Sequence, residues 1–204
     1  MEKRVITYID GFNLYFGLKS KGWRKYYWLN LYELSKKLIK QEQSLVKVKY
    51  FTARIEMPDD KRKRQLQFLE ALETLKQIDL FYGKYLSTTM ICRNCGSRWL
   101  KSNEKETDVN IAIEILTDAI QDNFDTALII SGDSDLSPAI RRTKQLFPDK
   151  RIISVFPPNR VSNELQNVVD GYFVLSENKI KSSLFPDKII KPDGFILHKP
   201  IEWN

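Results

Sequence analysis

The sequence predicts an α/β fold in three layers, α/β/α, in which helices cover both faces of a mainly parallel sheet of five or six strands. The first observation is that strand-like segments alternate with helical segments of roughly 10–20 residues, the order typical of βαβ units. The second is the segment 127–130, whose four apolar residues show no alternation and therefore indicate a strand buried on both faces. The third is size, because 204 residues with 42% hydrophobic side chains suit one domain with a sizeable core.

The first half of the chain contains three expected strands and three expected helices. The segment 5–9 is β-branched and aromatic, and it stops at Asp10-Gly11, which is a turn signal. Asn30 can cap a helix whose leucines are spaced for one buried face. The strands are expected at 5–9, 45–51 and 78–86, and the helices at 13–20, 31–39 and 58–75.

The second half continues this alternation after a polar, charged interruption at 87–106, which predicts a loop or small hairpin inserted into the domain. A helix follows from Thr107, its expected cap, with one apolar stripe at Val109, Ala112, Ile113, Leu116 and Ile120. The remaining strands are expected at 127–131, 151–156 and 172–175, and the helices at 136–146 and 161–167. We therefore expect one domain over 1–180 and a tail over 181–204 that packs on it through Phe195, Ile196, Leu197 and Trp203.

Charge and composition narrow the classes of function. A net charge of +7 and a pI near 9.3 favour an anionic partner, of which nucleic acid is the commonest, although solubility alone explains such a surplus equally well. The single histidine, His198, excludes catalysis by a histidine pair, so hydrolytic chemistry would rest on carboxylates, which favour Mg²⁺ or Mn²⁺. The sequence has no Gly-rich phosphate loop and so predicts no nucleotide cofactor.

The cysteines and the absence of long apolar runs bear on the compartment. Without a visible signal peptide or an apolar run long enough for a membrane span, the chain is expected to be cytoplasmic and to act away from membranes. Cys92 and Cys95 are then not expected to form a structural disulfide, and their Cys-x-x-Cys-Gly spacing matches half of a zinc knuckle. Structural Zn²⁺ would need a second pair from another chain, which would make a homodimer, or a contribution from His198. Two free thiols on a loop are the alternative.

Four aspartates lie where an α/β sheet usually carries its chemistry. Asp10 ends the first strand, Asp133 and Asp135 follow the strand at 127–131, and Asp108 lies in the first turn of the preceding helix. The carboxyl ends of parallel strands gather at one edge, so these acids should converge there. A turn or a helix N-terminus explains each acid alone, but several carboxylates on one edge predict a bound divalent cation. Asn13, one helical turn after Asp10, offers an amide to hold substrate or water.

Three ordered blocks of sequence contain these residues. They read Asp10-Gly-Phe-Asn13, then Glu104-Lys-Glu-Thr-Asp-Val-Asn-Ile-Ala112, then Ser131-Gly-Asp-Ser-Asp-Leu136. Over residues 4–175 the chain resembles NYN-domain proteins of the PIN-like nuclease superfamily, specifically its LabA/DUF88 branch. The resemblance implies a PIN-like fold and a ribonuclease that depends on Mg²⁺ or Mn²⁺. Carried over by position, Asp10, Asp108 and Asp133 match the metal-coordinating acids, Asp135 the second acid of its block, and Asn13 the polar residue of the first.

The reaction that the resemblance implies is metal-assisted hydrolysis of RNA phosphodiester bonds, with Asp135 as a ligand through water or as a general base. One alternative is a catalytically silent RNA-binding or regulatory module that kept the acidic pocket. A less favoured alternative is a small phosphohydrolase, because the Asp-x-Asp pair of haloacid-dehalogenase-type phosphatases is missing after the first strand, where the chain reads Asp10-Gly-Phe.

Several further side chains are candidates for substrate binding. Ser131 and Ser134 belong to the same turn as Asp133. Two basic runs are the candidate phosphate contacts, although either could be a solvated helix face; their members include Lys61, Arg62, Arg141, Arg142 and Lys144. The segment 23–28 mixes aromatic and basic residues, which suits stacking on unpaired bases but is equally typical of a core or a dimer surface.

Overall fold

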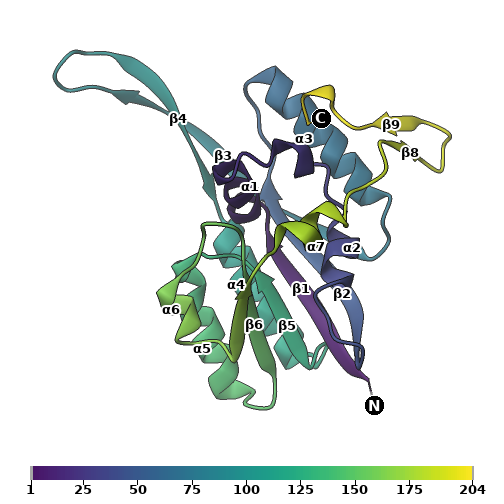
Figure 1. Cartoon of the computed structure of the whole chain (residues 1–204). Helices are drawn as coiled ribbons and strands as arrows, with labels where there is room; N and C mark the ends of the chain where they lie inside the picture. Colours follow the sequence, from purple (N-terminus) through teal and green to yellow (C-terminus); the bar gives the residue numbers. More distant parts are fainter. Residues whose placement is uncertain (1, 204) are drawn as a thin grey trace.

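The computed structural model describes residues 2–203, with the side chains of all of these except 85–88 and 99–104. It confirms the predicted three-layer α/β/α architecture with a mainly parallel sheet (Figure 1). Six strands run parallel and a seventh, β4, is antiparallel to β3. In their order across the sheet the strands are β4 (Arg98–Lys105), β3 (Ile78–Ile91), β2 (Gln43–Ala53), β1 (Lys3–Asp10), β5 (Thr126–Ile130), β6 (Arg151–Phe156) and β7 (Gly171–Val174).

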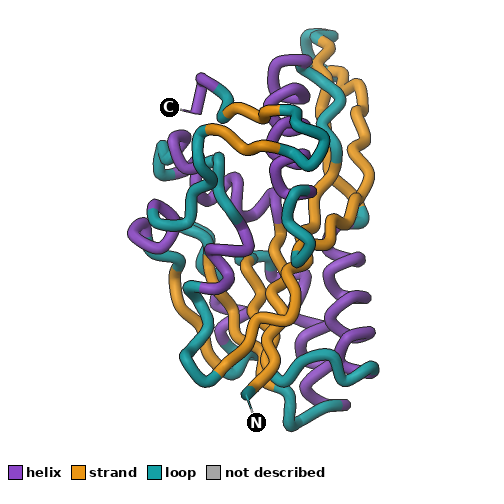
Figure 2. Tube along the Cα trace, turned by 90° about the vertical axis from the view of Figure 1, so that its right-hand side faces the viewer, coloured by secondary structure: helices purple, strands orange, loops and turns teal. Residues whose placement is uncertain are grey.

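Helices lie on both sides of this sheet, as Figure 2 shows. One face is covered by α1 (Gly11–Ser20), α2 (Leu31–Lys36) and α3 (Asp59–Glu73), which share one apolar cluster. The other face is covered by α4 (Thr107–Ile120), α5 (Ser137–Leu146) and α6 (Asn163–Gln166), which share a second. Short 3₁₀ turns, η1 (Arg24–Tyr26) and η2 (Ser134–Leu136), connect these elements.

The strand β1 lies at the centre of the sheet and separates the two cores. Val5 and Ile9 pack into one core, while Ile6 and Tyr8 pack into the other. Both faces are buried from Val5 onward, and four of the five residues from Val5 to Ile9 are apolar or aromatic, as is usual for a parallel strand. Because β1 pairs with β2 on one side and β5 on the other, its carboxyl end lies beside the ends of both.

The buried face of α4 differs from the prediction. Ile111, Ile115 and Ala119 face the core, whereas Val109, Ile113 and Ile120 of the predicted stripe are more than half exposed. The helix is apolar on two sides, and its buried side also carries an acid, Asp118, which made the other stripe look better in the sequence. The predicted cap is also wrong: Glu106, in a left-handed conformation, precedes the helix, and Thr107 is its first residue.

A buried ionic cluster explains how an acid fits on that face. The Lys49 ammonium on β2 lies 2.6 Å from carboxylate oxygens of both Asp118 and Glu114 on α4. The Tyr8 hydroxyl of β1 donates to the same Asp118 oxygen at 2.6 Å. Burial lowers the pKa of Lys49, but the two carboxylates outweigh it and the net shift is upward. The cluster therefore holds α4 on the sheet through paired charges.

The segment expected as an insert is a long hairpin. Strands β3 and β4 continue past the body of the sheet as an antiparallel ribbon that projects to one side (Figure 1). The chain turns between Ile91 and Arg98, so Cys92 and Cys95 lie at its tip.

The C-terminal segment forms α7 (Glu177–Lys181), a small hairpin of β8 (Lys188–Ile190) and β9 (Ile196–His198), and the turn η3 (Ile201–Trp203). Of the four residues expected to pack on the domain, Leu197 and Trp203 are buried, whereas Phe195 and Ile196 are about half exposed. Side chains alternate along a two-stranded hairpin, so only every second residue of β9 can face the domain.

The aromatic segment 23–28 contributes to the core, which was one of its predicted roles. Tyr26 and Trp28 are buried in the core beneath α1 and α3, while Tyr27 is only partly buried.

Within residues 2–203, none of the helices combines the length and apolar character that crossing a membrane requires.

Candidate metal centre

Three of the predicted acids converge at the carboxyl ends of β1 and β5. One carboxylate oxygen from each of Asp10, Asp108 and Asp133 lies within 4.8 Å of the others. Asp10 is the last residue of β1, Asp133 follows β5, and Asp108 lies in the first turn of α4. Since β1 and β5 are adjacent and parallel, with Ile9 opposite Ile130, their ends bring Asp10 and Asp133 together.

Asp10 and Asn13 join the two strand ends. One carboxylate oxygen of Asp10 accepts the Asn13 backbone N–H at 2.9 Å and so caps α1. The Asn13 side-chain oxygen accepts the Gly132 backbone N–H at 3.0 Å. Asn13 thus ties the start of α1 to the turn after β5, which fixes the position of Asp133 relative to Asp10.

Ser131 makes a second connection between the same acids. Its hydroxyl donates to the other Asp10 oxygen at 2.9 Å and accepts the Asp133 backbone N–H at 3.0 Å. The side chain is fully buried, so it positions acids and does not face the surface. Asp133 in turn accepts the Asp135 backbone N–H at 3.0 Å. Sequence reasoning placed Ser131 in the right turn but could not show that both functions of its hydroxyl are used within the protein.

Burial and neighbouring negative charges raise the pKa of two of these acids, Asp10 and Asp108. Burial raises the pKa of Asp10 to about 6, and the charges of Asp108 and Asp133 add to it, against the hydrogen bonds from Asn13 and Ser131. Burial also raises the pKa of Asp108, with further contributions from Asp133 and Asp135. Carboxylates held together at this separation favour a proton or a cation between them.

The donor set fits a hard divalent cation. Mg²⁺ and Mn²⁺ prefer carboxylate oxygens, and Mg²⁺ sites commonly use few protein ligands together with water and substrate phosphate. Three carboxylates from three different elements provide such a set on one side of an ion. Asp135 is exposed and is not part of this group, although its charge reaches Asp108.

Two glycines allow the backbone to pass close to this centre. A Cβ atom at Gly132 would overlap the backbone oxygen of Arg160, which crosses beside the turn. A Cβ atom at Gly11 would lie 2.6 Å from the Tyr50 hydroxyl and 2.7 Å from the Phe51 backbone oxygen. Both positions therefore require glycine because of close backbone approach.

The predicted substrate contacts are distributed over several surfaces. Ser134 begins η2 beside Asp133 and is partly buried. Lys61 lines a pocket next to the acids, whereas its neighbour Arg62 pairs with Asp59 on the outside of α3 at 3.1 Å. Arg141 and Arg142 are exposed on α5, on the opposite face of the sheet from Lys61, and Arg141 lies 4.0 Å from Glu164.

The cysteine pair lies away from the acids at the tip of the β3–β4 hairpin. The Cys92 backbone N–H donates to the Ser97 oxygen, and the Gly96 N–H donates to the Cys92 oxygen, so the two thiols sit on a tight turn. Cys95 is exposed, and hydrogen bonds from Ser97 and Cys92 lower its pKa to about 7. Among the described residues the acids form the one group of three or more metal ligands, so His198 does not complete a site here.

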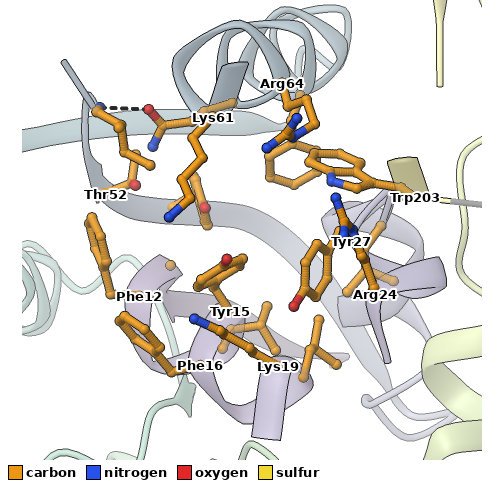
Figure 3. A pocket seen from close by; sticks show the side chains of 18 of the residues that line it. Phe12, Tyr15, Phe16, Lys19, Arg24, Tyr27, Thr52, Lys61, Arg64 and Trp203 are labelled. Atoms are coloured by element: carbon orange, nitrogen blue, oxygen red, sulfur yellow. Dashed lines mark hydrogen bonds between the residues drawn. The ribbon is translucent and has the colours of Figure 1, made fainter. Parts of the chain in front are cut away.

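A large pocket beside the acids was not predicted. Its volume is about 740 Å³, and its wall includes Gly11 and Phe12, the two residues that follow Asp10 (Figure 3). Aromatic and basic side chains from α1, η1, α3 and η3 line it. In the sequence, the mixed aromatic and basic segment 23–28 and Lys61 pointed to part of its lining, which includes Arg24, Tyr27 and Lys61.

Comparisons with known proteins agree with this architecture. The model of a family described as NYN domain matches residues 4–177. The chain is 30% identical over 199 residues to a protein named 6-hydroxy-3-succinoylpyridine 3-monooxygenase HspA from Pseudomonas putida, a match that covers 78% of this chain and 62% of that protein, less than two thirds of its length. A solved structure, titled a protein of unknown function VPA0982 from Vibrio parahaemolyticus, superposes with a TM-score of 0.56 at 17% identity, covering 87% of this chain and 95% of that one. At this identity the superposition shows the fold alone.

Proposed function

Because the chain belongs to the NYN domain family, we propose that it is a Mg²⁺- or Mn²⁺-dependent ribonuclease that hydrolyses RNA phosphodiester bonds beside Asp10, Asp108 and Asp133. The observation that carries the proposal is the convergence of these three carboxylates from β1, α4 and the turn after β5. From the resemblance of the three sequence blocks that contain them, we further propose that the chain belongs to the LabA/DUF88 branch of the PIN-like superfamily. The net charge of +7 is consistent with an RNA partner.

Each residue of the centre has a distinct role in this proposal. Asp10, Asp108 and Asp133 would hold the ion, which when bound makes a water molecule more acidic and offsets the negative charge of the scissile phosphate. Asn13 and Ser131 keep the ligands in place through the hydrogen bonds described above. Asp135, which is exposed two residues after Asp133, would accept a proton from the attacking water or hold a water on the ion.

The test is cleavage of a labelled RNA with and without Mn²⁺ or Mg²⁺, comparing the unchanged protein with Asp133→Asn. We expect metal-dependent cleavage that falls roughly 100-fold or more in the variant, because the substitution removes a charged ligand but keeps the shape of the side chain. Asp149→Asn is the control, since Asp149 is an exposed acid on the loop after α5. Equal cleavage by the two variants would contradict the proposal.

The same assay separates the proposal from the silent-module alternative. A catalytically silent RNA-binding module would bind RNA in a salt-sensitive manner, would retain this binding in Asp133→Asn, and would not cleave RNA with either metal. That combination of results would replace the ribonuclease by a binding function.

A second candidate function follows from the name of the Pseudomonas putida relative, which is that of a monooxygenase acting on a hydroxypyridine that carries a succinoyl group. The aromatic and basic lining of the pocket suits a flat, anionic compound of this kind as well as a nucleotide. The check is incubation with such a hydroxypyridine acid, dioxygen and a reductant, followed by mass spectrometry. Conversion of the acid to a product that carries oxygen from ¹⁸O-labelled dioxygen would support this second candidate, and recovery of the unchanged acid would contradict it.

The cysteine pair leads to a prediction about zinc and oligomeric state. Two thiolates on one hairpin supply half of a tetrahedral site, so we expect about one Zn²⁺ for every two chains, with the hairpin tips of two copies facing each other. Metal analysis and light scattering measure the two quantities. Cys92→Ser should lose both the zinc and the dimer, whereas Asp133→Asn should keep both. A zinc-free monomer of the unchanged protein would show that the thiols are free.

A further inference from the structure

The pocket beside the acids opens at the carboxyl ends of β1 and β2. Its floor includes Gly11, Tyr50 and Thr52. Gly11 directly follows Asp10, and Asp10 is paired in register with Phe51, the residue between the other two. The pocket and the acid cluster therefore lie at the same edge of the sheet, separated by the first turn of α1. The pocket lies on the face covered by α1 and α3, and Asp108 lies on the face covered by α4, so a strand that uses both would pass over the edge of the sheet at Asp10-Gly11.

Aromatic rings make up two walls of the pocket. Phe12, Tyr15 and Phe16 come from α1, and Tyr27, directly after η1, and Trp203 of η3 complete the aromatic lining (Figure 3). The ring centres of Tyr15 and Tyr27 are 5.0 Å apart, and those of Tyr27 and Trp203 are 5.7 Å apart. Tyr15 and Phe16 are 37% and 41% exposed, so part of each ring is accessible to a ligand. Walls of this kind accept a flat aromatic group by stacking.

The charged side chains that line the pocket are all basic. Lys19, Arg24, Lys61 and Arg64 line the pocket, and the described residues that line it include no acid. Arg64 is already paired with Asp60 at 2.7 Å and Glu202 at 2.8 Å, and these contacts hold η3 against α3. In Figure 3, Lys61 extends from α3 toward the rings of α1, with Lys19 on the opposite side. The chemistry is that of a flat group attached to a negative charge.

We propose that this pocket binds one unpaired nucleotide of single-stranded RNA, with its base against the α1 aromatics, its phosphate near Lys61, and the neighbouring phosphate at the acid cluster. The inference rests on the ribonuclease function proposed above and adds that the substrate is single-stranded where it is cut. A volume of about 740 Å³ lies within the usual range for ligand pockets and holds a nucleotide with room for its backbone. A base inside a duplex has both faces covered by its neighbours and cannot enter without unstacking.

The position of the pocket wall directly after Asp10, at Gly11 and Phe12, favours RNA over a free aromatic acid as the occupant. A free acid would need only the pocket, whereas an RNA strand uses the pocket and the acids together through consecutive phosphates. The pocket also extends beyond the space that a single aromatic ring requires, and its basic side chains occur on both α1 and α3, as expected for a backbone that passes between them. A small aromatic acid remains an outcome that the experiment recognises.

The experiment measures binding without cleavage. All proteins carry Asp108→Asn and are kept in EDTA, so the RNA stays intact and its repulsion by the acids is reduced. The probe is a short unstructured oligoribonucleotide that contains 2-aminopurine, whose emission falls when the base stacks on an aromatic ring. We expect Phe16→Ala and Lys61→Ala each to weaken binding about 5-fold to 10-fold, because the first removes a stacking surface for the base and the second removes a phosphate contact.

Two matched variants serve as controls. Lys63→Ala removes a second exposed lysine from α3 that does not line the pocket, and Phe195→Ala removes an exposed aromatic ring from the loop before β9. Both should bind within 2-fold of the parent protein. All four side chains are exposed or half-exposed, so the variants should fold, and a thermal melt of each verifies this.

The inference is overturned if Phe16→Ala and Lys61→Ala bind like their controls, or if a blunt duplex of the same sequence binds as tightly as the single strand. It is also overturned if nicotinate, a small aromatic acid, displaces the probe at a lower concentration than a nucleoside monophosphate does. Cleavage in Mn²⁺ is measured separately. If Phe16→Ala and Lys61→Ala weaken binding as expected but the unchanged protein does not cleave RNA, the ribonuclease proposal is refuted and the nucleotide site stands. If cleavage depends on Asp133 but the two variants bind normally, only the nucleotide site is refuted.

Discussion

Asp10→Asn is expected to abolish metal-dependent RNA cleavage and at the same time to stabilise the metal-free protein above pH 6. The pKa of Asp10 rises from an ordinary value of 3.8 to about 6, chiefly through burial. The folded chain therefore binds a proton more tightly than the unfolded chain does, and this contribution to stability is lost as the pH rises from about 4 to above 6. The difference between the pKa of Asp10 in the unfolded and the folded chain corresponds to roughly 3 kcal/mol of unfolding free energy, and the near-complete burial of Asp10 justifies using the full value.

Asparagine removes the charge while keeping the local hydrogen bonds. Its side-chain oxygen can still accept the Asn13 N–H, and its amide can donate to the Ser131 hydroxyl, which can accept in place of donating. We therefore expect the variant to gain up to roughly 3 kcal/mol over the unchanged protein at pH 8 and little at pH 4. Comparing the two proteins at each pH cancels the titration of the other groups.

Denaturant unfolding at pH 4 and pH 8, with and without Mn²⁺, measures both effects. Mn²⁺ should stabilise the unchanged protein at pH 8, less so at pH 5, where Asp10 must first lose a proton, and should leave Asp10→Asn unaffected. If Asp10→Asn is less stable than the unchanged protein at pH 8 in EDTA, burial of the Asp10 charge does not destabilise the metal-free protein as expected. Stabilisation of the variant by Mn²⁺ equal to that of the unchanged protein would show that Asp10 is not a ligand.

Lys49→Met is expected to lower the free energy of unfolding by about 3–5 kcal/mol. The lysine is 9% exposed and contacts two carboxylates, one of which, Asp118, is 3% exposed. Methionine fills a similar volume but leaves the Asp118 charge buried with only the Tyr8 hydroxyl and Asn123 amide as partners. Removing one partner of a buried pair costs this much because the other charge remains without compensation.

Lys47→Met provides the matched comparison. Lys47 lies two residues earlier on β2 and pairs with Asp79, but both side chains are substantially exposed. Its loss should cost less than about 1 kcal/mol, as for other surface pairs. Equal midpoints of denaturant unfolding for the two variants would contradict the role given to the buried cluster. Lys49→Met should also reduce metal affinity, because α4 carries Asp108 and the cluster holds α4 to the sheet.

The convergence of the acids could be predicted because it follows from topology. Asp10 and Asp133 each end a strand, and parallel neighbours bring their carboxyl ends to one edge whatever the packing of the helices. Topology alone could not predict the position of Asp108, because that position depends on how α4 packs on the sheet. The resemblance to known sequence blocks supplied it, and the structure places its carboxylate with the other two.

Other features depend on contacts that periodicity does not contain. The buried face of α4 was predicted wrongly because a charged residue, Asp118, is accommodated there by Lys49 from another strand. The aromatic pocket is lined by residues as far apart in the sequence as Tyr15 and Trp203, and a sequence pattern cannot show that such distant residues line one pocket. Ser131 looked like a substrate contact because hydroxyls in strand-end turns often are, but its burial becomes visible only when the neighbouring strands are in place.

The placement of Trp203 in the pocket wall bears on how the protein should be handled in the laboratory. The chain ends beside α3 (Figure 1), where the Arg64–Glu202 ion pair holds η3, so a polypeptide fused to the C-terminus would start close to the pocket and would compete with a ligand for it. The start of β1 lies at the opposite end of the sheet from the carboxylates. Purification handles and fluorescent reporters therefore belong ahead of Lys3, where they leave the entrance open.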